Sequence, residues 1–159
     1  MKIRIFTDGA CSENPGPGGW AIAINTPNKC HTFSGNEQLT TNNRMELRAV
    51  IEAFRRVLCK KTQRPDIQYD IYSDSAYVVN TINNNWLELW KKNDWKTVRR
   101  DDVKNKDLWE KLSKLMDMAK EQNIVITINK IRGHSGNTFN ELVDKLAKEE
   151  SMKAKVNKE

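Results

Sequence analysis

The sequence predicts an α/β fold in which a five-stranded mixed sheet is flanked by helices. Strand-like segments dominate the first 35 residues, and later strand-like segments alternate with segments of helical periodicity. An antiparallel hairpin followed by β-α-β alternation puts antiparallel and parallel strands into one sheet. With 159 residues, the chain is long enough for one domain with a substantial core.

The first strands are expected near the N-terminus. Ile3–Asp8 alternates between two side-chain sets, as a strand does. Trp20–Asn25 and His31–Gly35 are expected to form a hairpin. Between these strands, Asn14–Gly19 reads Asn-Pro-Gly-Pro-Gly-Gly. We expect a turn there, because this composition suits neither a helix nor a central strand.

Helices and strands alternate in the remainder of the chain. Apolar residues three and four apart predict helices, and short β-rich runs predict strands. The last strand is expected to be buried, because its run is continuously apolar and β-branched. The predicted helices are Asn43–Leu58, Ser75–Ile82, Asp107–Lys120 and Phe139–Lys148, with strands at Gln68–Ser73 and Ile124–Ile128.

The domain is expected to span residues 1–150, with a basic insert at about 86–104. The Lys-rich tail, 151–159, is expected to fray. Without an apolar run of about 18 residues or a signal-peptide core, we expect no membrane partner and a cytoplasmic location. Three cysteines without a C-x-x-C pair favour reduced thiols. A monomer is expected, because no hydrophobic interaction helix stands out.

Two acidic residues stand at the ends of predicted strands. Asp8 ends the first strand, and Asp74 follows Gln68–Ser73. If these strands are parallel neighbours, both carboxylates emerge at the sheet edge where α/β proteins bind ligands. The alternatives are local: Asp74 caps the next helix, and Asp8 with Gly9 forms a turn.

Two further acidic residues lie on predicted helices. Glu46 falls on the apolar stripe of its helix, where an acid is costly unless it is paired or metal-bound. Alternatively, Asn43 and Glu46 form a capping box. Asp144 borders an apolar stripe and could equally be a solvated helix acid. Taken together, the four acids suit Mg²⁺, which prefers carboxylate oxygens.

Five motifs appear in register and resemble type I ribonuclease H, in its bacterial-like form with a basic protrusion. The resemblance covers about Met1 to Ala147, and the motif Thr-Asn-Asn-Arg-Met-Glu-Leu is its most specific part. The motifs are Thr7–Cys11, Asn14–Gly19, Thr41–Leu47, Ser73–Ser75, and Gly133–Gly136 with Asn140–Asp144.

The resemblance implies a ribonuclease H-like fold and an endonuclease that hydrolyses the RNA strand of RNA/DNA hybrids. The expected products carry 5′-phosphate and 3′-hydroxyl ends. Asp8, Glu46, Asp74 and Asp144 would bind two Mg²⁺ ions, with Mn²⁺ as an alternative. His134 would be catalytic as a proton carrier, although it could also be an ordinary loop histidine.

The same resemblance implies which residues contact the RNA/DNA hybrid. In the insert, tryptophans interleave with cations that would neutralise phosphates. The alternative is a helical hairpin with core tryptophans and solvated lysines. Ala76 stands where the family often has a polar residue able to reach the nucleic acid. The expected substrate-binding residues are Asn14, Thr41, Asn42, Asn43, Trp86, Trp90, Lys91, Lys92, Lys96 and Arg99.

The charge and the acids separate this interpretation from three rivals. A net charge of +6 suits a polyanionic partner. A different metal nuclease on a related fold would lack these loop motifs. A non-catalytic hybrid-binding module would not need all four acids, and a structural domain would leave them unexplained.

Overall fold

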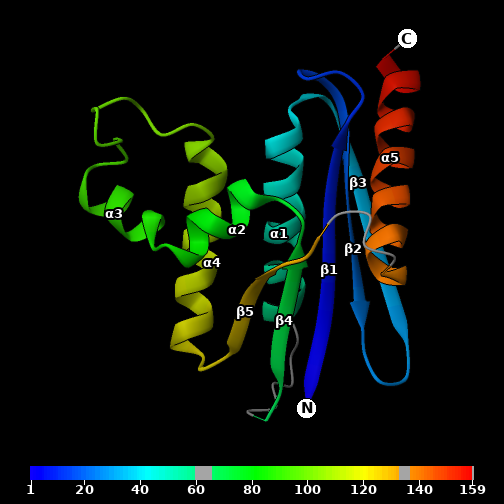
Figure 1. Ribbon diagram of the computed structural model, residues 1–159, viewed down its shortest axis with the longest axis horizontal. Coiled ribbons are helices and arrows are strands. Elements are labelled where there is room, and N and C mark those ends of the chain that lie inside the picture. Colours follow the sequence, from blue (N-terminus) through cyan, green and yellow to red (C-terminus); the bar gives the residue numbers. More distant parts are fainter. Residues whose placement is uncertain (60–65, 133–136, 159) are drawn as a thin grey trace.

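A mixed, five-stranded sheet forms the centre of the molecule, as the computed structural model in Figure 1 shows. It describes residues 1–59, 66–132 and 137–158. The strand order is β3-β2-β1-β4-β5, with β1, β2 and β3 antiparallel and β4 and β5 parallel to β1. The predicted mixed sheet is therefore confirmed. The strands are β1 (Lys2–Cys11), β2 (Gly16–Asn25), β3 (Cys30–Thr40), β4 (Gln68–Ser73) and β5 (Val125–Lys130).

Helices cover both faces of this sheet (Figure 1). Ile5 of β1 belongs to the larger core beneath α1 and α4, whereas its neighbour Phe6 belongs to a smaller core with Val143 of α5. This division follows from the alternation of side chains along a strand. The helices are α1 (Asn42–Leu58), α2 (Ala76–Asn83), α3 (Trp86–Lys92), α4 (Lys106–Glu121) and α5 (Thr138–Lys158).

The turn predicted at Asn14–Gly19 is wrong for its last four residues. Strand β2 begins at Gly16 and runs between β1 and β3, so its glycine-rich start lies in the sheet. Pro17 is tolerated because the β2–β3 register shifts between Gly16 and Gly18. The Pro17 carbonyl still accepts a hydrogen bond from the Ser12 N–H at 2.8 Å.

The last strand also differs from the prediction. β5 covers Val125–Lys130 and forms an edge of the sheet, so it is not buried on both faces. Only Ile128 of this strand is buried, and Val125 is 51% exposed. The run of β-branched residues reflects strand propensity at an edge, where one face of the strand meets solvent.

The frayed tail predicted from residue 151 is wrong as well. Helix α5 continues to Lys158, and Ser151 and Ala154 are buried. Gly19 of β2 allows this packing, because a Cβ there would lie 2.4 Å from the Ala147 carbonyl oxygen and 2.7 Å from the Ser151 nitrogen. The lysine-rich composition suggested an exposed tail, but the small residues Ala147, Ser151 and Ala154 form a buried stripe that faces the sheet.

We expect Gly19→Ala to lower the free energy of unfolding by about 1–3 kcal/mol, because the new methyl group would push α5 away from β2. Urea unfolding followed by circular dichroism measures this change. Thr32→Ala on the exposed part of β3 is the control and should stay within about 0.5 kcal/mol. Equal stability of the two variants would contradict the close packing.

Candidate active site

The first acidic side chain of the site lies where β1 meets α1. Asp8 is inside β1 and only 4% exposed, so the alternative of an Asp8–Gly9 turn is wrong. The next residue, Gly9, contacts the helix backbone: a Cβ there would lie 2.3 Å from the Glu46 nitrogen. The Gly9 N–H also donates to Asp8 Oδ1 at 2.9 Å. This close approach brings Asp8 beside Glu46.

Glu46 lies in the first turns of α1 but does not cap the helix. The cap is Thr41, whose Oγ1 accepts the Arg44 N–H at 3.2 Å, so the Asn43–Glu46 capping box is wrong. Glu46 is 5% exposed, and its Oε2 is buried with no hydrogen-bond partner among the residues that the structure describes. A buried carboxylate oxygen left in this state is costly unless a cation or proton joins it.

Asp74 reaches the same place from β4. The parallel register pairs Phe6 with Tyr72, and Asp8 and Asp74 lie two residues beyond that pair. Helix α2 is capped by Ser75, whose Oγ accepts the Val78 N–H, so the alternative in which Asp74 caps this helix is wrong. Carboxylate oxygens of Asp8, Glu46 and Asp74 all lie within 4.8 Å of one another.

Asp144 approaches the three acids from the opposite layer. It is half-buried on α5 and lines one cavity of about 620 Å³ together with Asp8, Glu46 and Asp74. Its Oδ2 forms an ion pair with Lys148 Nζ at 3.0 Å. The tertiary structure therefore brings all four predicted acids to one cavity.

Sequence reasoning missed several other residues that line this cavity. Helix α5 contributes a stripe beyond Asp144 with spacings of three and four residues, which is one face of a helix. That spacing was readable in the sequence, but the expectation of a frayed tail hid it. The missed residues are Cys11, Ser12, Lys148, Ser151, Met152 and Lys155.

Burial and like charge control the protonation of the two innermost acids. Desolvation, followed by the nearby charge of Asp74, raises the pKa of Asp8 from 3.8 to about 7. Desolvation, followed by the charge of Asp8, also raises the pKa of Glu46 well above its usual value. Such a group favours whatever neutralises it, either a proton or a bound cation.

The predicted substrate residues before α1 gather at the start of that helix. Asn14 Oδ1 accepts the Asn42 N–H at 3.0 Å, which ties the loop before β2 to the helix. Asn42 and Asn43 are exposed, and Asn42 lines the acidic cavity. Thr41 caps the helix, so its hydroxyl is engaged with the Arg44 N–H.

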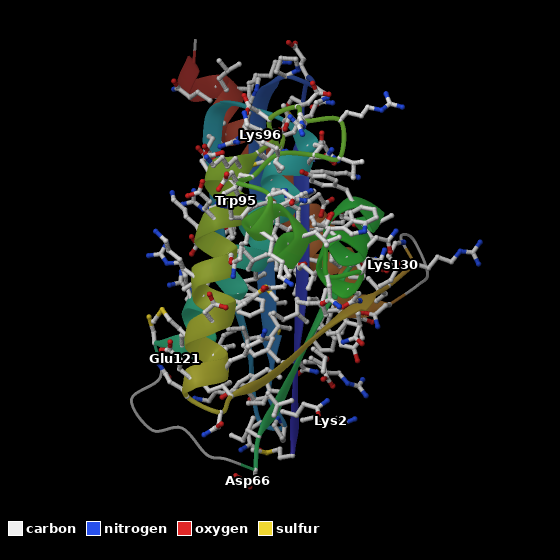
Figure 2. All side chains as sticks on the ribbon, turned by 90° about the vertical axis from the view of Figure 1, so that its left-hand side faces the viewer. Lys2, Asp66, Trp95, Lys96, Glu121 and Lys130 are labelled. Carbon is white, nitrogen blue, oxygen red and sulfur yellow. The ribbon has the colours of Figure 1, made fainter. Side chains whose placement is uncertain are left out.

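The basic insert projects from the α4 side of the molecule, away from the sheet (Figure 1). Trp86, Trp90, Lys96 and Arg99 line one hollow of about 550 Å³, and Trp86 is 44% exposed. Figure 2 shows Lys96 near the upper end of α4. The alternative of a purely structural hairpin is wrong for Trp86, because a core residue would be covered.

Tryptophans in the insert and on the neighbouring helix α4 divide into two groups. Trp109 is fully buried on α4, as the core alternative predicts, and the Trp90 ring meets it edge-on at 5.9 Å. Some cations are already engaged: Lys91 pairs with Glu88 and Asp117, and Lys96 pairs with Asp102. Lys92 and Arg99 are exposed, and the part of the chain that the structure describes offers them no ion pair.

Two further sequence expectations concern single residues. His134 lies outside the described residues, so its position stays a prediction. Ala76 opens α2 and is exposed beside Asp74. A third expectation concerns membranes. No helix of the described ranges is both long and apolar enough to cross one.

Comparison with known proteins identifies relatives over nearly the whole chain. The family model described as RNase H matches residues 1–152. The protein named Ribonuclease H from Acetivibrio thermocellus is 46% identical over 152 residues, with 96% of each chain covered. Ribonuclease H from Chlorobium chlorochromatii is 45% identical over 148 residues, covering 93% of this chain and 94% of that protein.

Solved structures show the same architecture. LC9-RNase H1, described as a type 1 RNase H with the type 2 active-site motif, matches with a TM-score of 0.78 and 27% identity, covering 96% of this chain and 73% of that chain. LC11-RNase H1 in complex with an RNA/DNA hybrid matches with a TM-score of 0.69 and 25% identity, covering 96% and 98%.

The raised pKa of Asp8 predicts how stability depends on pH without divalent cations. The folded-state pKa of Asp8 is about 7 and exceeds the unfolded value of 3.8, so the folded protein holds the Asp8 proton more tightly. The contribution of this proton to the free energy of unfolding is therefore complete below pH 3.8 and is lost as the pH rises through 7. Asp8→Asn should therefore stabilise the metal-free protein at pH 8 by about 2–4 kcal/mol, with a smaller gain near pH 4.

Thermal unfolding in a chelating buffer across this pH range measures the effect. Glu121→Gln, at an exposed position on α4, is the charge-matched control and should show no such trend. If Asp8→Asn raises the stability by the same amount at pH 4 and at pH 8, ionisation of Asp8 is not the cause of the increase.

Proposed function

The chain belongs to the ribonuclease H family, and we propose that it is an endonuclease that hydrolyses the RNA strand of RNA/DNA hybrids. The products would carry 5′-phosphate and 3′-hydroxyl ends. The observation that carries the proposal is the cluster of Asp8, Glu46 and Asp74, whose carboxylate oxygens lie within 4.8 Å of one another. Asp144 in the same cavity supplies a fourth carboxylate.

The donor set fits divalent cations. Oxygen ligands alone suit Mg²⁺ or Mn²⁺. Within the described ranges the buried Oε2 of Glu46 has no hydrogen-bond partner, and a bound cation would neutralise it. We propose that Asp8, Glu46, Asp74 and Asp144 hold two Mg²⁺ ions, with Mn²⁺ as a substitute. When bound, such a pair activates water and stabilises the leaving oxygen of an in-line displacement.

The chain's own residues would orient the substrate and move protons. Asp8 is held rigidly by β1 and by the Gly9 N–H, which limits the reorganisation needed during reaction. By family resemblance, His134 would carry a proton at the cleaved phosphate, since imidazole titrates near neutral pH. We assign these tasks to a catalytic domain of residues 1–150.

Selection of the RNA strand would occur at the start of α1. The 2′-hydroxyl is the group that distinguishes RNA from DNA at a given site. We propose that groups around Asn14, Asn42 and Glu46 sense it. Asn14 Oδ1 accepts the Asn42 N–H, and both Asn42 and Glu46 line the acidic cavity, which supports this proposal. Thr41 and Asn43 would add sugar and phosphate contacts at the helix terminus.

The basic insert at about 86–104 would hold the DNA strand. Trp86 and Trp90 present aromatic surface in the same hollow as Lys96 and Arg99. Exposed Lys92 lines a second hollow, which shares Lys96 with the first. Lys91 would contribute charge after exchange of its carboxylate partners for phosphate. We propose that the enzyme acts as a cytoplasmic monomer.

Asp74→Asn should abolish cleavage of a labelled RNA/DNA hybrid, by at least about 100-fold, while the protein stays folded. Cleavage is measured with and without Mg²⁺, and with Mn²⁺, beside duplex RNA, duplex DNA and single strands. Asp66→Asn, at an exposed position after the undescribed segment, is the matched control.

Two outcomes would contradict the proposal. Full activity of the wild type in a chelating buffer would exclude divalent cations. Cleavage of duplex DNA as fast as the hybrid would point to a different metal nuclease on a related fold.

The double variant Lys92→Gln with Arg99→Gln should weaken hybrid binding and lower the salt slope of log K by about two units, one for each lost phosphate contact. Fluorescence anisotropy at several salt concentrations measures the slope. Lys106→Gln, whose lysine pairs with Glu110, is the control and should leave it unchanged. If the double variant has the same salt slope as the wild type, the insert does not contact the phosphates of the hybrid.

A further inference from the structure

We propose that the last turns of α5 extend the nucleic-acid surface, and that Lys155 binds a backbone phosphate of the hybrid away from the cleaved bond. The inference rests on the proposed function and adds a contact that the sequence motifs do not include, since those motifs end at Asp144. It concerns the segment that the lysine-rich composition marked as a frayed tail.

The end of α5 is held firmly enough to present a side chain in a fixed place. Ser151 is buried, and its Oγ donates to the Pro17 carbonyl oxygen at 3.0 Å and lies 2.5 Å from Ser12 Oγ. Glu150 accepts a hydrogen bond from Asn36 Nδ2 at 2.7 Å. These contacts join the helix to β2, to β3 and to the loop after β1.

The helix then aims one face at the acidic cavity. Asp144, Lys148, Ser151 and Lys155 follow one another at spacings of four, three and four residues, so they lie along one side of α5. All four line the cavity that holds Asp8, Glu46 and Asp74. Lys155 is thus part of the wall of this cavity, whereas its neighbour Lys153 lies on another face.

Charge distinguishes Lys155 from the other cation of the cavity. Lys148 is paired with Asp144 at 3.0 Å, and Lys153 outside the cavity is paired with Glu150 at 3.1 Å. Within the described ranges, no carboxylate oxygen lies within 4.0 Å of Lys155 Nζ. Its ammonium group is exposed and available for a phosphate.

The position of Lys155 along α5 limits which phosphate of the hybrid it can bind. Lys155 follows Asp144 by eleven positions, which corresponds to about 16 Å along the helix axis. A nucleic-acid strand advances by about 3.4 Å per nucleotide along its axis. A phosphate that Lys155 binds therefore lies up to about five nucleotides from the cleaved bond, and this contact adds affinity without touching the reacting atoms.

The test compares Lys155→Gln with Lys2→Gln, both in full-length protein that also carries Asp8→Asn to prevent cleavage. Lys2 is an exposed lysine at the opposite end of the molecule, as Figures 1 and 2 show. Binding of a labelled RNA/DNA hybrid is measured at several salt concentrations. Lys155→Gln should weaken binding about fivefold at 0.1 M salt and lower the salt slope by about 0.9. Lys2→Gln should change affinity less than about twofold.

A second measurement places the contact along the hybrid. When the hybrid is shortened stepwise from each end, the effect of Lys155→Gln should vanish at a defined length on one side only. Thermal unfolding of both lysine variants should match the parent, since both positions are exposed.

The outcomes separate the two proposals. If the wild type cleaves the hybrid but Lys155→Gln binds like Lys2→Gln with the same salt slope, the inference about α5 is overturned and the proposed function stands. If the effect persists at every hybrid length, Lys155 acts by general charge and the specific contact is wrong. If the wild type neither binds nor cleaves the hybrid, both proposals fail.

Discussion

The close approach of β1 to α1 at Gly9 is the constraint on which the site depends. A side chain at this position would collide with the helix backbone, since its Cβ would lie 2.3 Å from the Glu46 nitrogen and 2.4 Å from the Met45 carbonyl carbon. Only glycine permits the contact. Because the strand and the helix touch there, the carboxylates of Asp8 and Glu46 lie side by side, and β4 adds Asp74 through its parallel register with β1.

This arrangement opposes folding until a cation is present. Two of the clustered acids are almost fully buried, and desolvation raises the pKa of both Asp8 and Glu46. Buried acids of like charge cost stability, which is offset by the large core beneath α1. The same cost makes the site selective for a positive charge, so local instability and cation binding have one physical origin.

Two cationic regions flank the acidic cavity on different elements. The insert lies beyond α4, and the end of α5 lies over the opposite face of the sheet. Most of the polyanion-binding surface that we propose therefore lies outside the cavity, where its cations do not compete with a metal ion for the carboxylates. Two cations of α5, Lys148 and Lys155, line the cavity wall, and Lys148 is paired with Asp144.

Local pattern determined much of this protein. The periodicity predicted the mixed sheet and the cores of the helices, because side-chain alternation and helical spacing depend only on near neighbours. The motifs identified Asp8, Glu46, Asp74 and Asp144 as a set. Sequence alone left each acid with a local alternative, since capping and metal binding use the same residue types.

Tertiary structure decided between those alternatives. Thr41 caps α1 and Ser75 caps α2, so neither Glu46 nor Asp74 serves as a helix cap, and both lie at the acidic cavity. It also placed a glycine-rich segment in the centre of the sheet and made a lysine-rich tail into a packed helix. The physical reason is that packing at Gly19 depends on residues far apart in the chain, and no local propensity encodes the partner that a small side chain will meet.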